Sequence, residues 1–166
     1  MEGDAGVTVA RSILPPFQDF LEANRATVYR FLTVAVGPQD ADDAFQETFI
    51  AALRAYPRVR EPGKLDRWIL AIASRTAIDH HRGAARRPLP TDAPPERPAH
   101  DPAPADLDDP LWQAVRALPA RQRVAVVHRH VLDRPYAEIA EIMACTEATA
   151  RANVYQGTKR LRELMS

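Results

Sequence analysis

The side chains best suited to chemistry lie near the carboxyl end of the chain, where they recur at helical spacing. They are Arg151, Asn153, Tyr155, Gln156, Lys159, Arg160 and Arg162. Arg, Asn and Gln can make paired hydrogen bonds to the edges of bases, and Arg and Lys bind phosphates. A helix that combines both types can read duplex DNA if its amino-terminal turns enter the major groove. A solvated amphipathic helix is the alternative interpretation.

Two smaller charged groups lie in the first half of the chain. Asp42, Asp43 and Glu47 form an acidic group in the first turns of a predicted helix, where carboxylates suit the helix dipole. The second group is basic and follows another predicted helix: it consists of His80, His81, Arg82, Arg86 and Arg87. Opposite charges indicate different partners, and the basic group is a candidate for binding nucleic acid. Solvated surfaces remain the alternative for both groups.

Patterns typical of an enzyme are missing from the sequence. It has no Gly-rich phosphate loop, no nucleophile elbow and no metal-ligand spacing. Cys145 falls in a predicted turn, where a small buried thiol is expected. His128 and His130 are two residues apart on a predicted helix, so they face different directions. We therefore expect no catalytic residue, metal, cofactor or small-molecule substrate.

The charge of the chain is unevenly distributed. Its 22 basic and 22 acidic residues cancel, which by itself would argue against a nucleic-acid partner. Counted by segment, however, residues 1–87 carry a net charge of +1, residues 88–110 carry −5 and residues 111–166 carry +4. The neutral total therefore hides an acidic segment between two modules, the second of which is basic.

The single cysteine excludes an intrachain disulfide. No charged start followed by an apolar segment is present in residues 1–10, and no run approaches the ~20 apolar residues that span a bilayer. These features predict a cytoplasmic protein without direct membrane insertion.

Apolar spacing predicts three helices in the first module, residues 14–87. They cover residues 17–36, residues from about 40 to Pro57, and residues from Leu65 into the basic group. Residues 58–64, with Pro62 and Gly63, form the loop before the third helix. Residues 1–13 are expected to be a disordered tail. Residues 88–110 hold eight of the 15 prolines and are expected to be an acidic linker that could span roughly 70 Å.

The second module, residues 111–166, is also predicted to be helical. Helices are expected at 111–118, 120–131, 136–143 and 147–164. The last two, joined by a turn of about three residues with Thr146 as N-cap, form a helix-turn-helix. Ile139, Ala140 and Met143 are expected to pack against Ala148, Val154 and Leu161. The chain is therefore predicted to be all-α, with two small helical domains.

At this point the residues resemble a known family. Residues 42–49, Asp-Asp-Ala-Phe-Gln-Glu-Thr-Phe, are similar to the polymerase-binding helix of bacterial sigma-70 factors of the two-domain extracytoplasmic-function group. Residues 68–82 resemble the promoter-melting helix of that group, and residues 118–123 and 136–140 resemble the entry to its helix-turn-helix. The order of these motifs along the chain makes the resemblance specific.

The resemblance implies a sigma factor that binds core RNA polymerase and directs it to promoters. Asp42, Asp43, Gln46, Glu47 and Phe49 would meet the largest polymerase subunits. The linker would thread into the polymerase, where its acidic residues could mimic nucleic acid. An anti-sigma protein is a further partner that the resemblance implies.

The two modules would bind different promoter elements. The minus 10 element would be opened and held as a single strand by the first module, through Arg58, Arg60, Lys64, Trp68, Arg75, Asp79, His80, Arg82, Arg86 and Arg87. Capture of an unstacked base needs a pocket with a stacking or cationic surface. Trp68 also fits a core position. The minus 35 element would be read as duplex by Arg121, Tyr136, Thr146, Glu147, Thr149, Arg151, Asn153, Tyr155, Gln156, Lys159 and Arg160.

Some residues depart from the family pattern. Arg75 stands where asparagine is usual, Asn153 and Gln156 stand where arginine is common, and Ala144 replaces a frequent glycine. These departures leave promoter sequence and strength open. Two alternatives therefore remain: a helix-turn-helix regulator that works without polymerase, and a polymerase-binding protein without initiation activity.

Overall fold

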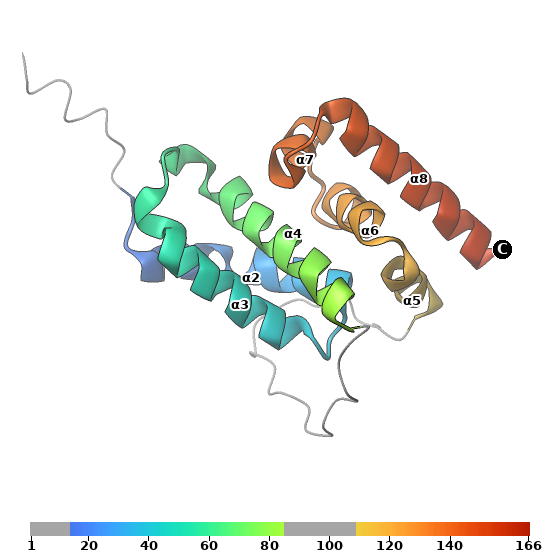
Figure 1. Cartoon of the computed structure of the whole chain (residues 1–166), viewed down its shortest axis with the longest axis horizontal. Coiled ribbons are helices and arrows are strands. Elements are labelled where there is room, and N and C mark those ends of the chain that lie inside the picture. The colour runs from blue at the N-terminus through green and yellow to red at the C-terminus, as the bar shows by residue number, and fades with distance from the viewer. Residues whose placement is uncertain (1–13, 85–108) are drawn as a thin grey trace, which may run out of the picture.

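The computed structural model describes residues 14–84 and 109–166, with only the backbone of 81–84, and all regular structure there is helical (Figure 1). The all-α prediction is thus confirmed for this part of the chain. The predicted tail, the predicted linker up to residue 108, Arg86 and Arg87 lie outside the described residues. None of the described helices is both long and apolar enough to cross a membrane.

Three helices form the first module: α2 (Phe17–Val36), α3 (Ala41–Ala55) and α4 (Leu65–Ala84). α2 ends at Gly37, where a φ of +92° favours glycine, and Pro38 follows. Two 3-10 turns, η1 (Tyr56–Arg58) and η2 (Pro62–Lys64), connect α3 to α4, each with a proline at its start that cannot continue an α-helix. Phe20, Phe49 and Tyr56 are buried between these helices.

The second module contains α5 (Pro110–Ala117), α6 (Ala120–Val126), the π-helical turn η3 (Val127–Val131), α7 (Tyr136–Met143) and α8 (Glu147–Met165). α5 begins one residue earlier than predicted, because the carboxylate of Asp109 caps it by accepting a hydrogen bond from the backbone N–H of Leu111 at 2.7 Å. The helix predicted over 120–131 is not uniform, since its second half is η3.

The predicted helix-turn-helix is present in α7 and α8. Oγ1 of Thr146 accepts a hydrogen bond from the backbone N–H of Thr149 at 3.1 Å, as expected of an N-cap. One predicted packing contact is wrong: Ala148 is exposed, and Ala150 is the buried alanine of that turn. The reason is that the capping turn directs Ala148 to solvent, so the apolar stripe begins at Ala150.

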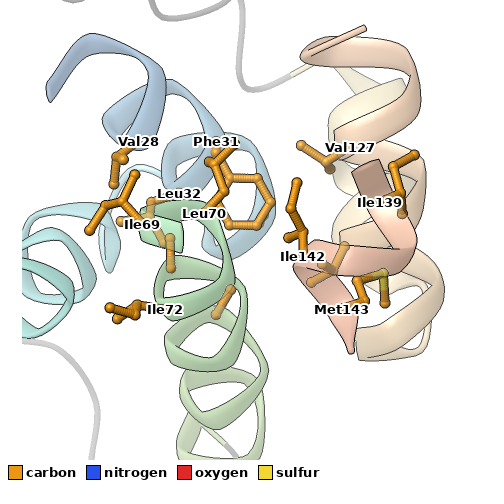
Figure 2. Packing of buried hydrophobic residues seen from close by; sticks show 14 of the residues in the cluster. Val28, Phe31, Leu32, Ile69, Leu70, Ile72, Val127, Ile139, Ile142 and Met143 are labelled. Carbon is orange, nitrogen blue, oxygen red and sulfur yellow. The ribbon is translucent and has the colours of Figure 1, made fainter. Parts of the chain in front are cut away.

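The tertiary arrangement joins the two modules through one hydrophobic core. α4 packs against α2 and α3 on one side and against α6 and α7 on the other, while α8 packs on α5, α6 and α7 at the outside (Figure 1). Figure 2 shows Phe31 and Leu70 on one side of the contact between the modules, with Val127 and Ile142 on the other. The modules are therefore closed on each other in this structure.

Candidate nucleic-acid and protein interfaces

Helix α3 presents a mixed acidic and apolar face to solvent. Asp43, Gln46 and Glu47 are exposed, as predicted, and Asp42 is half-buried. The apolar part was not predicted: Ile50 and Leu53 are 51% and 55% exposed. Positions 46, 50 and 53 lie on one face of the helix. Helical spacing counted from Gln46 therefore predicts that Ile50 and Leu53 belong to the same face.

Phe49 does not belong to this exposed face. It is buried, with its ring 4.7 Å from that of Phe45 and 6.3 Å from that of Phe20. The prediction that Phe49 contacts a partner directly is therefore wrong in this structure. Phe49 instead anchors α3 in the core, because burial of its aromatic ring is favourable there.

Two residues predicted to meet different partners contact each other. Nε2 of His80, on α4, lies 2.8 Å from Oε2 of Glu47, on α3. A carboxylate only accepts, so His80 donates this hydrogen bond. The side chain of His80 is buried, which corrects its assignment to an exposed DNA-binding surface. The contact ties the acidic face of α3 to the carboxyl-terminal part of α4.

Four of the residues predicted to bind a single strand line one cavity of about 410 Å³. They are Arg58, Arg60, Lys64 and Trp68, and Val59, Glu61, Arg67, Ala71 and Glu141 complete the wall. The ring of Trp68 is half-buried and packs 5.7 Å from Phe20 and 6.1 Å from Tyr56. Trp68 is thus both a core residue and a cavity wall. A cationic rim with an aromatic wall can hold an unstacked base and its phosphate.

Arg75 and Arg121 lie together at a second cavity of about 480 Å³, with Ser74, Ile78, Glu141, Ile142 and Met143 among its other lining residues. Arg121 was predicted to act with α8, but the structure places it beside α4, on the side of α6 that meets the first module. Asp79 is exposed on α4, while only the backbone of Arg82 is described.

Apart from Tyr136 on α7, the remaining predicted residues lie along α8 or at its start. Arg151, Tyr155, Gln156, Lys159 and Arg160 are exposed, as are Thr146, Glu147 and Thr149 at its start. Asn153 is half-buried, and its Nδ2 donates to the carbonyl of Thr149 at 3.2 Å. This bond uses one of the two N–H groups of the amide, so the second N–H and Oδ1 can still contact a base.

Arg151 is held in place by two neighbours. Its Nη2 lies 2.9 Å from Oε1 of Glu147, and its guanidinium lies 4.4 Å from the ring centroid of Tyr136. Arg129, from η3, also stacks on Tyr136 at 4.4 Å. Tyr136 therefore contacts two guanidinium groups. Arg129 was missed by sequence reasoning, because its place beside Tyr136 depends on the π-helical turn.

Family models match both modules of the chain. The family model of Sigma-70 region 2 matches residues 20–87, and that of Sigma-70, region 4 matches residues 108–161. The ECF RNA polymerase sigma factor SigC of Mycobacterium tuberculosis is 31% identical over 141 residues, which cover 81% of this chain and 75% of SigC. SigD of the same species is 30% identical over 159 residues, which cover 88% of this chain and 75% of SigD.

A solved structure has the same fold. It is the sigma factor RpoE in complex with the anti-sigma factor NepR from Bartonella quintana, with a TM-score of 0.64 and 20% identity, and it covers 90% of this chain and 96% of RpoE.

Proposed function

Because the chain belongs to the sigma-70 family, in its extracytoplasmic-function group, and acts in promoter-directed transcription initiation, we propose how its residues divide that task. Residues 14–87 form the region 2 domain, residues 111–166 form the region 4 domain, and residues 88–110 connect them. The protein works by binding rather than by catalysis, and does so in the cytoplasm with RNA polymerase.

The exposed face of α3 is the proposed surface for core polymerase. Asp43, Gln46 and Glu47 supply charge and hydrogen bonds, while Ile50 and Leu53 supply apolar area. Exposed apolar side chains beside polar ones are typical of protein interfaces. A substitution at Glu47 would also break its contact with His80 and could disturb the fold of the domain. Substitutions at Ile50 and Leu53 therefore test polymerase binding more cleanly.

The cavity beside α4 is the proposed site for an unstacked base of the minus 10 element. Arg58, Arg60 and Lys64 surround an opening whose wall includes Trp68, and this juxtaposition carries the proposal. The cations would bind the phosphates next to the base, and the aromatic and apolar wall would contact the base itself. Arg75, exposed farther along α4, would continue the cationic track.

Helix α8 is the proposed reader of the minus 35 duplex. Its first turns carry Thr146, Glu147, Thr149 and Arg151 on a capped amino-terminal end, the part of a recognition helix that meets base edges. Tyr155, Gln156, Lys159 and Arg160 follow on exposed positions. Arg129 and Arg151, stacked on Tyr136, extend this surface to η3.

An anti-sigma protein is a further proposed partner. Support comes from the solved relative, which is a complex with the anti-sigma factor NepR and shares the fold of this chain. Capture of the chain by such a protein would compete with its binding to core polymerase.

Run-off transcription with purified core polymerase on genomic fragments tests the proposed division of labour. We expect transcripts that depend on the chain and that disappear when Arg60 and Trp68 are both replaced by alanine. Core binding without any transcript would instead favour a polymerase-binding regulator. Duplex binding without core binding would favour a helix-turn-helix regulator that works alone.

A further inference from the structure

The carboxylate of Glu47, on the proposed polymerase surface, is held by a residue of another helix. Its Oε2 accepts a hydrogen bond from Nε2–H of His80 at 2.8 Å. The side chain of Glu47 is 54% exposed, whereas that of His80 is 4% exposed. One end of this contact therefore lies in the core of the domain, and the other end lies at its surface.

His80 holds Glu47 from a fixed position. The imidazole ring is buried where α4 packs against α3, and Glu47 is the acceptor that the described residues offer to Nε2–H. A buried N–H without an acceptor destabilises the folded state, so this bond is maintained as long as the domain is folded. The Glu47 carboxylate is therefore kept in one place on the surface.

The contact leaves part of the carboxylate for a partner. Oε1 of Glu47 has no hydrogen bond or ion pair among the residues that the structure describes. Helical spacing places the exposed Ile50 one turn farther along the same face. A cation that pairs with Oε1 therefore lies beside an apolar contact, as polar groups at the rim of protein interfaces do.

Holding Glu47 in advance favours binding in two ways. Association has an entropy cost for each flexible side chain that it immobilises, and His80 has already restricted this one. Asp43 lies four residues before Glu47, and like charges at this spacing repel each other. The bond to His80 opposes that repulsion and keeps the two carboxylates on one surface.

The contact lies wholly within the first domain. Other polar contacts of α4 reach the second domain instead: Nη2 of Arg67 lies 2.9 Å from Oε1 of Glu138, and Oγ of Ser74 lies 2.8 Å from Nε2 of His128. His80 lies farther along α4 and turns toward α3. The bond that it donates therefore does not depend on how the two domains are arranged.

We propose that His80 is a positioning residue for core polymerase, because it fixes the carboxylate of Glu47 in the orientation that polymerase binds. His80 itself contacts neither polymerase nor DNA, and it acts through Glu47. This inference rests on the proposed assignment of the polymerase surface to α3.

The test compares three variants of the full chain. His80→Met fills a similar volume but removes the donor, while His80→Gln places an amide N–H donor near the position of Nε2. Thr48→Val is the matched control: Oγ1 of the buried Thr48 donates to the carbonyl of Ala44 at 2.7 Å, so this change removes a buried hydrogen bond of α3 that does not involve Glu47. Affinity for labelled core polymerase and the urea midpoint are measured for each.

We expect His80→Met to weaken core binding by about threefold to tenfold, because Glu47 must then be ordered during association. His80→Gln should recover most of this loss. Thr48→Val should lose stability but bind core like the natural chain. If His80→Met binds core no more weakly than Thr48→Val, or if His80→Gln binds as weakly as His80→Met, the positioning role is overturned.

A double-mutant cycle separates positioning from a general effect on the fold. In the Glu47→Ala background there is no carboxylate to position, so His80→Met should cause no further loss of core affinity. An equal loss in both backgrounds overturns the inference.

The same measurements distinguish failure of this inference from failure of the surface assignment. If Glu47→Ala weakens core binding but His80→Met does not, the inference alone fails. If neither Glu47→Ala nor Ile50→Ser weakens core binding, the assignment of the polymerase surface to α3 fails as well.

Discussion

His128 stacks on Phe31 across the contact between the two domains, with ring centroids 4.5 Å apart and ring planes at 11°. His128 is fully buried, and burial, together with the charge of Arg134, lowers its pKa from 6.5 to about 3. Its Nδ1 has no hydrogen-bond partner among the residues that the structure describes. The closed arrangement therefore contains a neutral imidazole that a proton would disrupt.

This burial predicts a pH-dependent stability. Below pH 6.5 the unfolded chain binds a proton at His128, whereas the folded chain does not until the pH approaches 3. The free energy of unfolding is therefore highest above pH 6.5 and falls as the pH drops from 6.5 toward 3. By pH 5 the loss amounts to about 2 kcal/mol. Urea unfolding at pH 7 and pH 5 measures it. His128→Gln, which does not titrate, should be less stable at pH 7 but show a smaller loss on acidification. Equal losses in both proteins would contradict the prediction.

Removal of the exposed apolar side chains of α3 should weaken polymerase binding. Burial of one aliphatic side chain contributes ~1.5–3 kcal/mol, so Ile50→Ser should reduce core affinity by roughly tenfold or more. Leu164→Ser removes an aliphatic side chain of similar exposure, 52%, near the end of α8 and away from this face; it is the matched control and should bind normally. Affinity is measured by titrating labelled core polymerase with the full chain. Unchanged affinity of Ile50→Ser would remove this face from the interface.

The turn of the helix-turn-helix contains a strained alanine. Ala144 has φ +52° and ψ +50°, a left-handed conformation that favours glycine. Ala144→Gly should therefore stabilise the chain by about 0.5–1 kcal/mol, even though glycine gains entropy on unfolding. Ala152→Gly, in the exposed interior of α8, should instead destabilise it by about 1 kcal/mol. Urea midpoints distinguish the two; destabilisation by both would show that Ala144 is not strained.

Tyr136 should act by positioning Arg151 and Arg129 through its ring. Each exposed cation–π contact contributes ~0.5–1 kcal/mol, so loss of both in Tyr136→Leu should weaken binding to a minus 35 duplex by about fivefold to thirtyfold. Tyr136→Phe keeps the ring face and should bind nearly as well as the natural chain. Anisotropy titrations with the full chain measure both. Equal losses would mean that the hydroxyl contacts DNA instead.

Arg151→Ala should cost about 1–3 kcal/mol of duplex binding if that side chain reads a base. The loss should be largest on the preferred sequence and smaller on altered sequences. An unchanged sequence preference, measured by competition among duplexes, would exclude Arg151 from base recognition.

The helices and their order could be predicted from sequence because their signals are local. Apolar spacing, prolines and the Thr146 cap act within a few residues, and these signals predicted α2, α3, α4, α7 and α8 close to their observed ends. The exposed residues of α8 followed from the same spacing.

Tertiary structure alone decided which faces are covered. Arg67 and Glu138 are 71 residues apart in sequence, and Ser74 and His128 are 54 apart, so no local pattern specifies either contact. The same long-range packing buries Phe49 and His80, which the sequence suggested for partners, and leaves Ile50 and Leu53 outside. Local spacing determined which residues share a helix face; packing between distant helices determined which of those faces remain for polymerase and promoter.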